Sequence, residues 1–188
     1  TASAQAVAAC IRAAGKVYPG CLLTITGGEP TLRPTFAGEV ALALEQPGVG
    51  QVQVQTNAVA FARRLDPAAW PARDDLSFFA SLHALDPVIY DACTGTEGQL
   101  PRALLGIRRL MEGGHRVTVN CLIQRLNQAH LPGYIEALPA ALPWNPRAAL
   151  HFSVLICPEY RPGAEDFLVR YSQLAPALEA AAARASAL

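Results

Sequence analysis

The sequence contains few charged residues and no long apolar run. Only 16% of its 188 residues are charged, and the formal net charge is zero. No basic field therefore favours nucleic acid, and no acidic excess favours a basic partner. No stretch approaches the ~18 apolar residues of a membrane span, and no basic and apolar leader precedes a cleavage site. We expect a cytoplasmic protein without a membrane or nucleic-acid partner.

Cysteine is sparse and widely spaced. The five cysteines are Cys10, Cys21, Cys93, Cys121 and Cys157. No two of them have the spacing of a zinc or iron–sulfur motif. Without a leader, a reducing compartment is favoured, and there most of these side chains are expected to be small buried hydrophobes. The sequence therefore predicts no metal ligand.

What the chain does have is apolar residues, at 52% of its length, which is enough for one globular domain over residues 1–188. The first residues, from Thr1, already fit a helical pattern and include no initiating Met. We expect that the natural protein has a segment upstream of this chain, so that the domain is truncated at its N-terminus.

Helix and strand patterns alternate along the sequence. Strands are expected at residues 21–26, 51–55, 76–83, 116–123 and 149–155. Helices are expected at residues 2–17, 34–46, 59–70 with a break at Asp66-Pro67, 100–111, 131–138 and 164–188. This order predicts an α/β protein with parallel strands, either a doubly wound sheet or a β/α barrel. In both, the ligand site lies at the carboxyl ends of the strands.

One face of the predicted strands is polar in strand after strand. Gln51, Gln53 and Gln55 alternate with Val52 and Val54, and the other strands alternate in the same way. An unpaired buried polar group costs roughly 1–3 kcal/mol, so a dry closed interior would not carry this many. The polar face could simply face water, but helical crossovers favour a wide polar cavity.

The first predicted strand runs into Gly27-Gly28-Glu29-Pro30. The two glycines let the backbone take positive φ and approach a ligand closely. Pro30 favours an extended Glu29. Such a turn presents backbone donors and one fixed carboxylate at a strand end, a set that can hold the ammonium and carboxylate of a zwitterion.

These residues resemble the GGEP motif of radical S-adenosylmethionine (SAM) enzymes. The resemblance covers roughly residues 17–152, and its other elements fall at successive strand ends. They are Thr56-Asn57, where Ala58 replaces the glycine of the family's Thr-Asn-Gly, then Ser81-Leu82-His83, and Val117-Thr118-Val119-Asn120.

The resemblance implies a partial (β/α)6 TIM-like barrel. It also implies an enzyme, an oxidoreductase or maturase that cleaves SAM reductively to a 5'-deoxyadenosyl radical, which then takes a hydrogen from a substrate. The substrate would be a peptide or a cofactor precursor by analogy. An electron donor such as flavodoxin or ferredoxin would be the protein partner.

The resemblance also implies which residues bind SAM, while no catalytic residue is assigned. The methionine end would be held by Thr26, Gly27, Gly28, Glu29 and Pro30. Ser81 and Asn120 would bind the ribose, and Asn57 and His83 would line the cavity near the nucleoside. We expect His83 to be a hydrogen-bond partner rather than a general base.

The family's cluster motif, CxxxCxxC, is absent from this chain. It should precede the helix at residues 2–17, so the first strand, the cluster loop and three iron ligands are missing. We therefore expect a [4Fe–4S] cluster only in the full-length protein, and no activity from this chain alone.

One alternative is a degenerate SAM- or nucleoside-binding barrel that acts as a non-catalytic partner subunit. Another is an unrelated barrel that binds phosphate at Gly27-Gly28.

Two cysteines lie near predicted strand ends. Cys93 is expected in a loop after the His83 strand, and Cys157 follows the last strand. Either thiol could donate a hydrogen atom or bind an auxiliary cluster, but we expect both to be inert. Arg161-Pro162-Gly163 is expected to form a lid or a turn.

Overall fold

A computed structural model of the chain describes residues 2–154 and 167–185. Within these residues, parallel strands form a single curved sheet in the order β1-β2-β3-β4-β5. The strands are β1 (Cys21–Ile25), β2 (Val49–Thr56), β3 (Leu76–Ser81), β4 (Arg116–Ile123) and β5 (Ala148–Val154). The predicted α/β class with parallel strands is confirmed.

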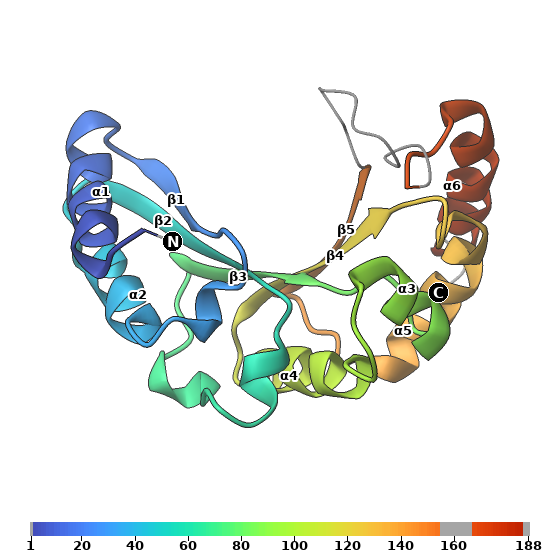
Figure 1. The fold of residues 1–188 in the computed structure, drawn as a ribbon, viewed down its shortest axis with the longest axis horizontal. Coiled ribbons are helices and arrows are strands. Elements are labelled where there is room, and N and C mark those ends of the chain that lie inside the picture. Colours follow the sequence, from blue (N-terminus) through green and yellow to red (C-terminus); the bar gives the residue numbers. More distant parts are fainter. Residues whose placement is uncertain (1, 155–166, 186–188) are drawn as a thin grey trace.

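The helices lie mainly on the convex side of the sheet, which opens as a crescent in Figure 1. They are α1 (Ala4–Val17), α2 (Phe36–Glu45), α3 (Pro87–Thr94), α4 (Leu100–Glu112), α5 (Leu131–Ala141) and α6 (Tyr171–Ala185). In the described part of the chain, four 3-10 turns join them, η1 (Pro30–Leu32), η2 (Val59–Ala62), η3 (Pro67–Ala69) and η4 (Gln128–His130). The described residues contain no helix long and apolar enough to cross a membrane.

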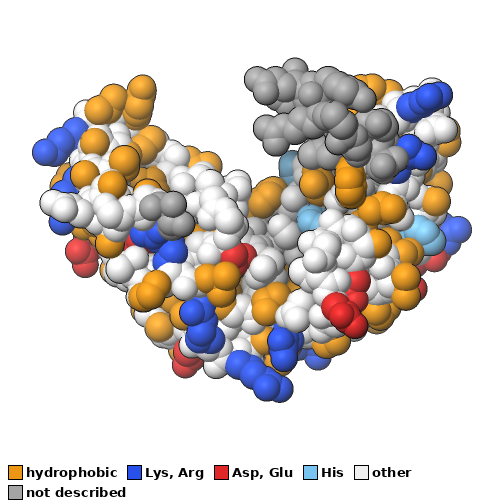
Figure 2. All heavy atoms as spheres, in the orientation of Figure 1, with side chains coloured by type: hydrophobic (Ala, Val, Ile, Leu, Met, Phe, Trp, Pro, Cys, Tyr) orange, Lys and Arg blue, Asp and Glu red, His pale blue; other side chains and the backbone are white. Residues whose placement is uncertain are grey.

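The alternation of side chains along the strands separates the two faces of the sheet. Val54 and Phe78 are buried in register with Val117, and this apolar row packs against the helices. The opposite face carries Gln55 and Thr118, which are only half-buried. Figure 2 shows the corresponding hollow between the two arms of the molecule. The polar face therefore lines the concave side, as the sequence predicts.

Three predicted helix boundaries are wrong for local reasons. The helix expected from residue 34 begins at Phe36, because Arg33 is extended (φ −71°, ψ 133°) before Pro34. Residues 59–70 form the short 3-10 turns η2 and η3 rather than a helix, and η2 follows Ala58 at φ 60°; the expected break at Asp66-Pro67 is present between the two turns. The last helix begins at Tyr171, beyond a segment tied to the β4–α5 loop by a hydrogen bond from the Arg125 N–H to the Phe167 carbonyl.

The contact between α4 and η2 is a second determinant of the architecture. Gly106 of α4 lies against the Ala58 carbonyl, where an added Cβ would stand 2.0 Å from that oxygen. The Arg109 Nη1 atom donates a hydrogen bond of 2.7 Å to the Phe61 carbonyl. Together these contacts fix α4 beneath the carboxyl end of β2.

Candidate functional site

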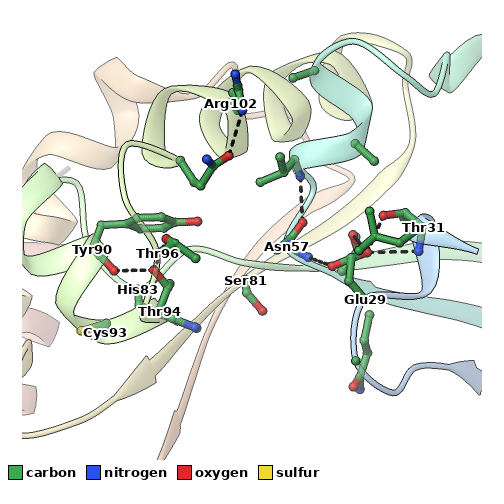
Figure 3. A pocket seen from close by; sticks show the side chains of 18 of the residues that line it. Glu29, Thr31, Asn57, Ser81, His83, Tyr90, Cys93, Thr94, Thr96 and Arg102 are labelled. Atoms are coloured by element: carbon green, nitrogen blue, oxygen red, sulfur yellow. Dashed lines mark hydrogen bonds between the residues drawn. The ribbon is translucent and has the colours of Figure 1, made fainter. Parts of the chain in front are cut away.

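A cavity of about 870 Å³ opens at the carboxyl ends of β1, β2 and β3. Figure 3 shows the side chains that surround it, from η1 on one side to α3 and α4 on the other. The sequence assigns nine residues to SAM binding. Five of them have polar side chains and line this cavity together: Thr26, Glu29, Asn57, Ser81 and His83. Gly28 lines it as well. The predicted polar cavity is therefore present.

The turn after β1 has the backbone conformation that the sequence predicts. Gly27 has φ +97° and Gly28 has φ +53°, in the region that favours glycine. Glu29 is extended at φ −118° and ψ 105° before Pro30. Gly27 and Pro30 line a neighbouring cavity of about 1100 Å³ between α1 and β1, which Gly28 and Glu29 also border.

The carboxylate of Glu29 is held by four hydrogen-bond donors. Its Oε1 accepts from the Thr31 N–H at 3.2 Å, from the Thr31 hydroxyl at 2.6 Å and from the Thr56 hydroxyl at 2.7 Å. Its Oε2 accepts from the Asn57 N–H at 2.7 Å. A carboxylate offers about four acceptor positions, and Oε2 uses only one of its two. Glu29 thus presents one fixed, unused acceptor position on Oε2.

The segment after β2 is organised around the same carboxylate. The Thr56 hydroxyl, which donates to Glu29, accepts a hydrogen bond from the Ala58 N–H at 3.0 Å. The Asn57 Oδ1 accepts from the Val59 N–H at 3.0 Å, which leaves the amide NH₂ of Asn57 as its free donor. Ala58 adopts φ 60° where the family motif has glycine, so the alanine keeps the glycine conformation at a cost in backbone strain.

The imidazole of His83 is neutral and oriented by the backbone. Its Nδ1 accepts a hydrogen bond from the Leu122 N–H at 3.2 Å, which places the ring proton on Nε2. Burial lowers the pKa of His83. Because the Nδ1 lone pair is used, Nε2–H is the group left for a ligand. This arrangement favours the predicted hydrogen-bonding role of His83 over a role as general base.

Ser81 and Asn120 are paired across β3 and β4. The Asn120 Oδ1 accepts from the Ser153 hydroxyl at 3.0 Å, and the His151 Nδ1 lies 3.0 Å from the same oxygen. Asn120 is buried beside the cavity rather than on its wall. Its carbonyl oxygen is used internally, so only its amide N–H groups remain for a ligand.

The cysteines do not form a cluster site in the described residues. Cys93 lies in α3 rather than in the predicted loop, because Pro87–Thr94 forms a helix capped by the Asp86 carboxylate. Burial raises the pKa of Cys93. Burial, and secondarily the neighbouring Cys93, raises the pKa of Cys121 to about 12. Both thiols are therefore protonated at neutral pH.

Not all the cysteine predictions are tested or correct. Cys121 is buried as expected, whereas Cys10 is exposed. Cys157 and Arg161-Pro162-Gly163 lie outside the described residues. Across residues 2–154 and 167–185, no three Cys, His, Asp or Glu side chains are grouped so that they could hold a metal ion. A [4Fe–4S] cluster therefore does not fit this part of the chain.

Several side chains at the site are not among the residues predicted from the sequence. Thr31 and Thr56 position Glu29, and Phe79 contacts the His151 ring at 5.4 Å between centroids. Tyr90 and Thr94 line the cavity from α3. Strand parity alone places Phe79 on the concave face with Ser77 and Ser81, so that residue could have been found.

Comparison with known proteins connects this geometry to a family. No family model matches the chain. Among curated proteins, GTP 3',8-cyclase from Vibrio parahaemolyticus is 32% identical over 114 residues, which is 60% of this chain and 33% of that protein. GTP 3',8-cyclase from Edwardsiella ictaluri is 30% identical over 145 residues, or 76% of this chain and 41% of that protein.

The chain is a homologue of radical SAM enzymes. The resemblance that the sequence motifs indicate is thereby confirmed. The matched segment spans about a third of the length of the first of these curated relatives.

Solved structures of radical SAM proteins share the fold. The structure of native anSMEcpe with bound AdoMet and the Cp18Cys peptide has a TM-score of 0.71 at 14% identity, and covers 94% of this chain and 50% of that one. The structure of TYW1 with a lysine-pyruvate adduct has a TM-score of 0.60 at 15% identity, covering 84% of this chain and 48% of that one. The predicted partial TIM-like barrel is confirmed.

Proposed function

We propose that this chain is the SAM-binding part of a radical SAM enzyme. The observation that carries the proposal is the carboxylate of Glu29, which four donors hold at the carboxyl end of the sheet with one acceptor position on Oε2 unused. An ammonium group is the natural partner of such a position, because a charged donor to a carboxylate makes a strong hydrogen bond. The homology to radical SAM enzymes supports the methionine ammonium of SAM as that group.

The remaining cavity residues suit the rest of the SAM molecule. Gly27 and Gly28 allow the backbone to approach the methionine moiety closely. Ser81, the Nε2–H of His83 and the amide group of Asn57 line the cavity and offer hydrogen bonds to a ribose or an adenine, with Asn120 buried beside them. Thr26 is held by a 3.0 Å hydrogen bond from its hydroxyl to Gln55, which leaves its hydroxyl oxygen as an acceptor at the same edge.

When bound together with a reduced [4Fe–4S] cluster, SAM supplies the radical chemistry of the family. The described residues contribute binding, orientation and exclusion of water, and the cluster ligands would come from another part of the protein. We propose an electron donor such as flavodoxin or ferredoxin as its partner. The substrate class, a peptide or a cofactor precursor, follows by analogy with neighbours whose structures hold a peptide.

Calorimetry tests the proposal with the full-length protein that contains this chain, after anaerobic reconstitution. Glu29→Gln removes the carboxylate charge while keeping the side-chain shape, so we expect SAM affinity to fall at least tenfold. Glu45→Gln on the outer surface of α2 is the matched control and should leave SAM affinity unchanged. Simple phosphates should not compete with SAM.

Three results would contradict the proposal or part of it. Unchanged SAM affinity in the Glu29→Gln protein would remove Glu29 from the site. Absence of SAM binding by the reconstituted wild-type protein, with phosphate bound instead, would support an unrelated phosphate-binding barrel. SAM binding without SAM cleavage under reducing conditions would support the non-catalytic partner subunit.

A further inference from the structure

Three exposed arginine side chains line the cavity at the carboxyl ends of the strands. Arg63 and Arg64 follow η2, and Arg102 belongs to the first turn of α4. We call these three residues the arginine rim. Among the described residues that line the cavity, Glu29 is the one other with a formal charge, counting histidine as neutral. Because the whole chain has no net charge, the rim is a local concentration of positive charge.

The rim cations are not neutralised within the described part of the chain. The Arg64 Nη2 atom donates to the Thr31 carbonyl, and the Arg102 Nη1 atom donates to the Gln99 Oε1 at 3.3 Å. None of the ion pairs between described residues includes a rim arginine. The carboxylate of Glu29 already accepts four hydrogen bonds, and those donors do not include an arginine.

A rigid contact fixes the two parts of the rim relative to each other. Gly106 brings α4 directly against the Ala58 carbonyl, and Arg109 ties α4 to Phe61 at the centre of η2. The guanidinium of Arg109 is thus used for structure, whereas that of Arg63 makes no hydrogen bond to a described residue and that of Arg102 uses only Nη1, in its bond to Gln99. Binding groups carried on rigid elements are positioned more accurately than groups on loops.

The surroundings of the rim also favour negative charge. The amino end of α4 borders the cavity through Gln99, and no side chain caps it, so the positive end of the helix dipole is not neutralised there. The hydroxyl groups of Thr94 and Thr96, 2.6 Å apart, line the same side of the cavity, but they add no donor for an anion, because the Thr94 hydroxyl donates to the Tyr90 carbonyl at 2.8 Å and therefore accepts from Thr96. Figure 3 shows them on α3 and the loop that follows it, across the cavity from Glu29.

We propose that the arginine rim binds an anionic group, a phosphate or a carboxylate, of the substrate. This inference rests on the proposed function, since it treats the cavity as the place where SAM and substrate meet. The cavity volume of about 870 Å³ lies near the upper end of the ~300–1,000 Å³ range of small-molecule sites, which leaves room for more than one ligand. Arginine suits such a group because its planar guanidinium matches phosphate and carboxylate oxygens in pairs.

The test titrates the reconstituted full-length protein with inorganic phosphate at constant ionic strength, observed by NMR, and repeats the titration with acetate. We expect saturable binding with the largest shifts at residues 62–65 and 96–102. The double variant Arg63→Gln, Arg102→Gln should weaken phosphate binding at least fivefold. Arg64 is left unchanged because it contacts Thr31. Arg12→Gln, an exposed arginine on α1, is the matched control and should have no effect.

SAM affinity of the same proteins separates this inference from the proposed function. We expect the double variant to bind SAM as wild type does, within about twofold. A parallel loss of SAM and phosphate affinity would overturn the inference, because the rim would then belong to the SAM carboxylate. Non-saturable shifts, or equal affinity in wild type and double variant, would also overturn it. Tighter binding of acetate than of phosphate would support a carboxylate as the anionic group.

Discussion

Two regions of one cavity handle charge in opposite ways. At the glutamate edge, formed by residues 26–31 with Thr56 and Asn57, four donors surround one carboxylate and fix its position. At the arginine rim, three guanidinium groups have two hydrogen bonds to neutral oxygens and no carboxylate partner among the described residues. The first region is assembled before any ligand arrives, and the second keeps its donors available.

The difference indicates what each region can recognise. A carboxylate with a single unused acceptor position selects one donor in one place, as a constant cofactor requires. Long arginine side chains on a fixed backbone can change rotamer to follow ligands of different shape, at a cost in side-chain entropy on binding. An arginine outside the rim shows the alternative: Arg33 is paired with the buried Glu39 at 2.7 Å and serves stability.

The largest effect on stability is expected from Gly106→Ala, which disrupts the contact between α4 and η2 that joins the two regions. Its added Cβ would stand 2.0 Å from the Ala58 carbonyl oxygen, so α4 or η2 has to move. We expect a loss of at least about 3 kcal/mol in the free energy of unfolding, because backbone on both sides leaves little room to relax. Urea denaturation measures this change in the free energy of unfolding.

Gly38→Ala is the matched control, since it makes the same change in α2 where an added Cβ meets nothing within 4 Å. It should leave stability unchanged or raise it by up to about 1 kcal/mol through helix propensity. If Gly106→Ala were as mild as this control, α4 would not be locked to η2 and the rim would not be preorganised.

A smaller effect is expected from Thr56→Val, which acts on the glutamate edge alone. The substitution removes one of the donors to Glu29 and leaves the buried Ala58 N–H without its acceptor. We expect a loss of roughly 1–3 kcal/mol in the free energy of unfolding, together with weaker SAM binding. Phosphate binding at the rim should remain as in wild type.

Thr118→Val is the control for Thr56→Val, because Thr118 lies on the same sheet and its hydroxyl makes no hydrogen bond to a described residue. Its effect on stability should stay within about 0.5 kcal/mol. A Thr56→Val protein with wild-type SAM affinity would show that Glu29 holds its position without the Thr56 hydroxyl, and would weaken the contrast between the two regions.

The sequence could predict the glutamate edge because its signals are local. Two glycines and a proline fix the backbone around Glu29, and strand alternation places Asn57, Ser81 and His83 on the concave side. Most strand boundaries follow from the same periodicity, whereas the sheet order β1-β2-β3-β4-β5 agrees with the barrel that the family resemblance implies, because periodicity alone leaves a doubly wound sheet open as well. What the pattern could not show is that the Glu29 carboxylate is oriented by Thr56, which is 27 residues away in the sequence.

The arginine rim could not be predicted because it depends on tertiary contacts. Arg63 and Arg102 are 39 positions apart, from the difference of their residue numbers, and neither lies in a motif. They line the same cavity because Gly106 allows α4 to approach Ala58. The segment after Ala58 was also expected to be helical, which would have turned Arg63 and Arg64 in other directions. A single positive φ at Ala58 changes that path.

The smallest effect is expected from Ala58→Gly, at the junction of the two regions. Glycine relieves the strain of φ 60°, worth about 1–2 kcal/mol for a residue with a Cβ. It also removes a fully buried methyl group, at about 0.8 kcal/mol, and adds about 0.4–1 kcal/mol of unfolded-state entropy. These contributions nearly cancel, so the free energy of unfolding should change by less than about 1 kcal/mol in urea denaturation. A loss beyond about 2 kcal/mol would mean that the Ala58 methyl group contributes more to the contact with α4 than its positive φ costs. Ala58 would then help to hold the arginine rim in place, and would not be a merely tolerated replacement for glycine.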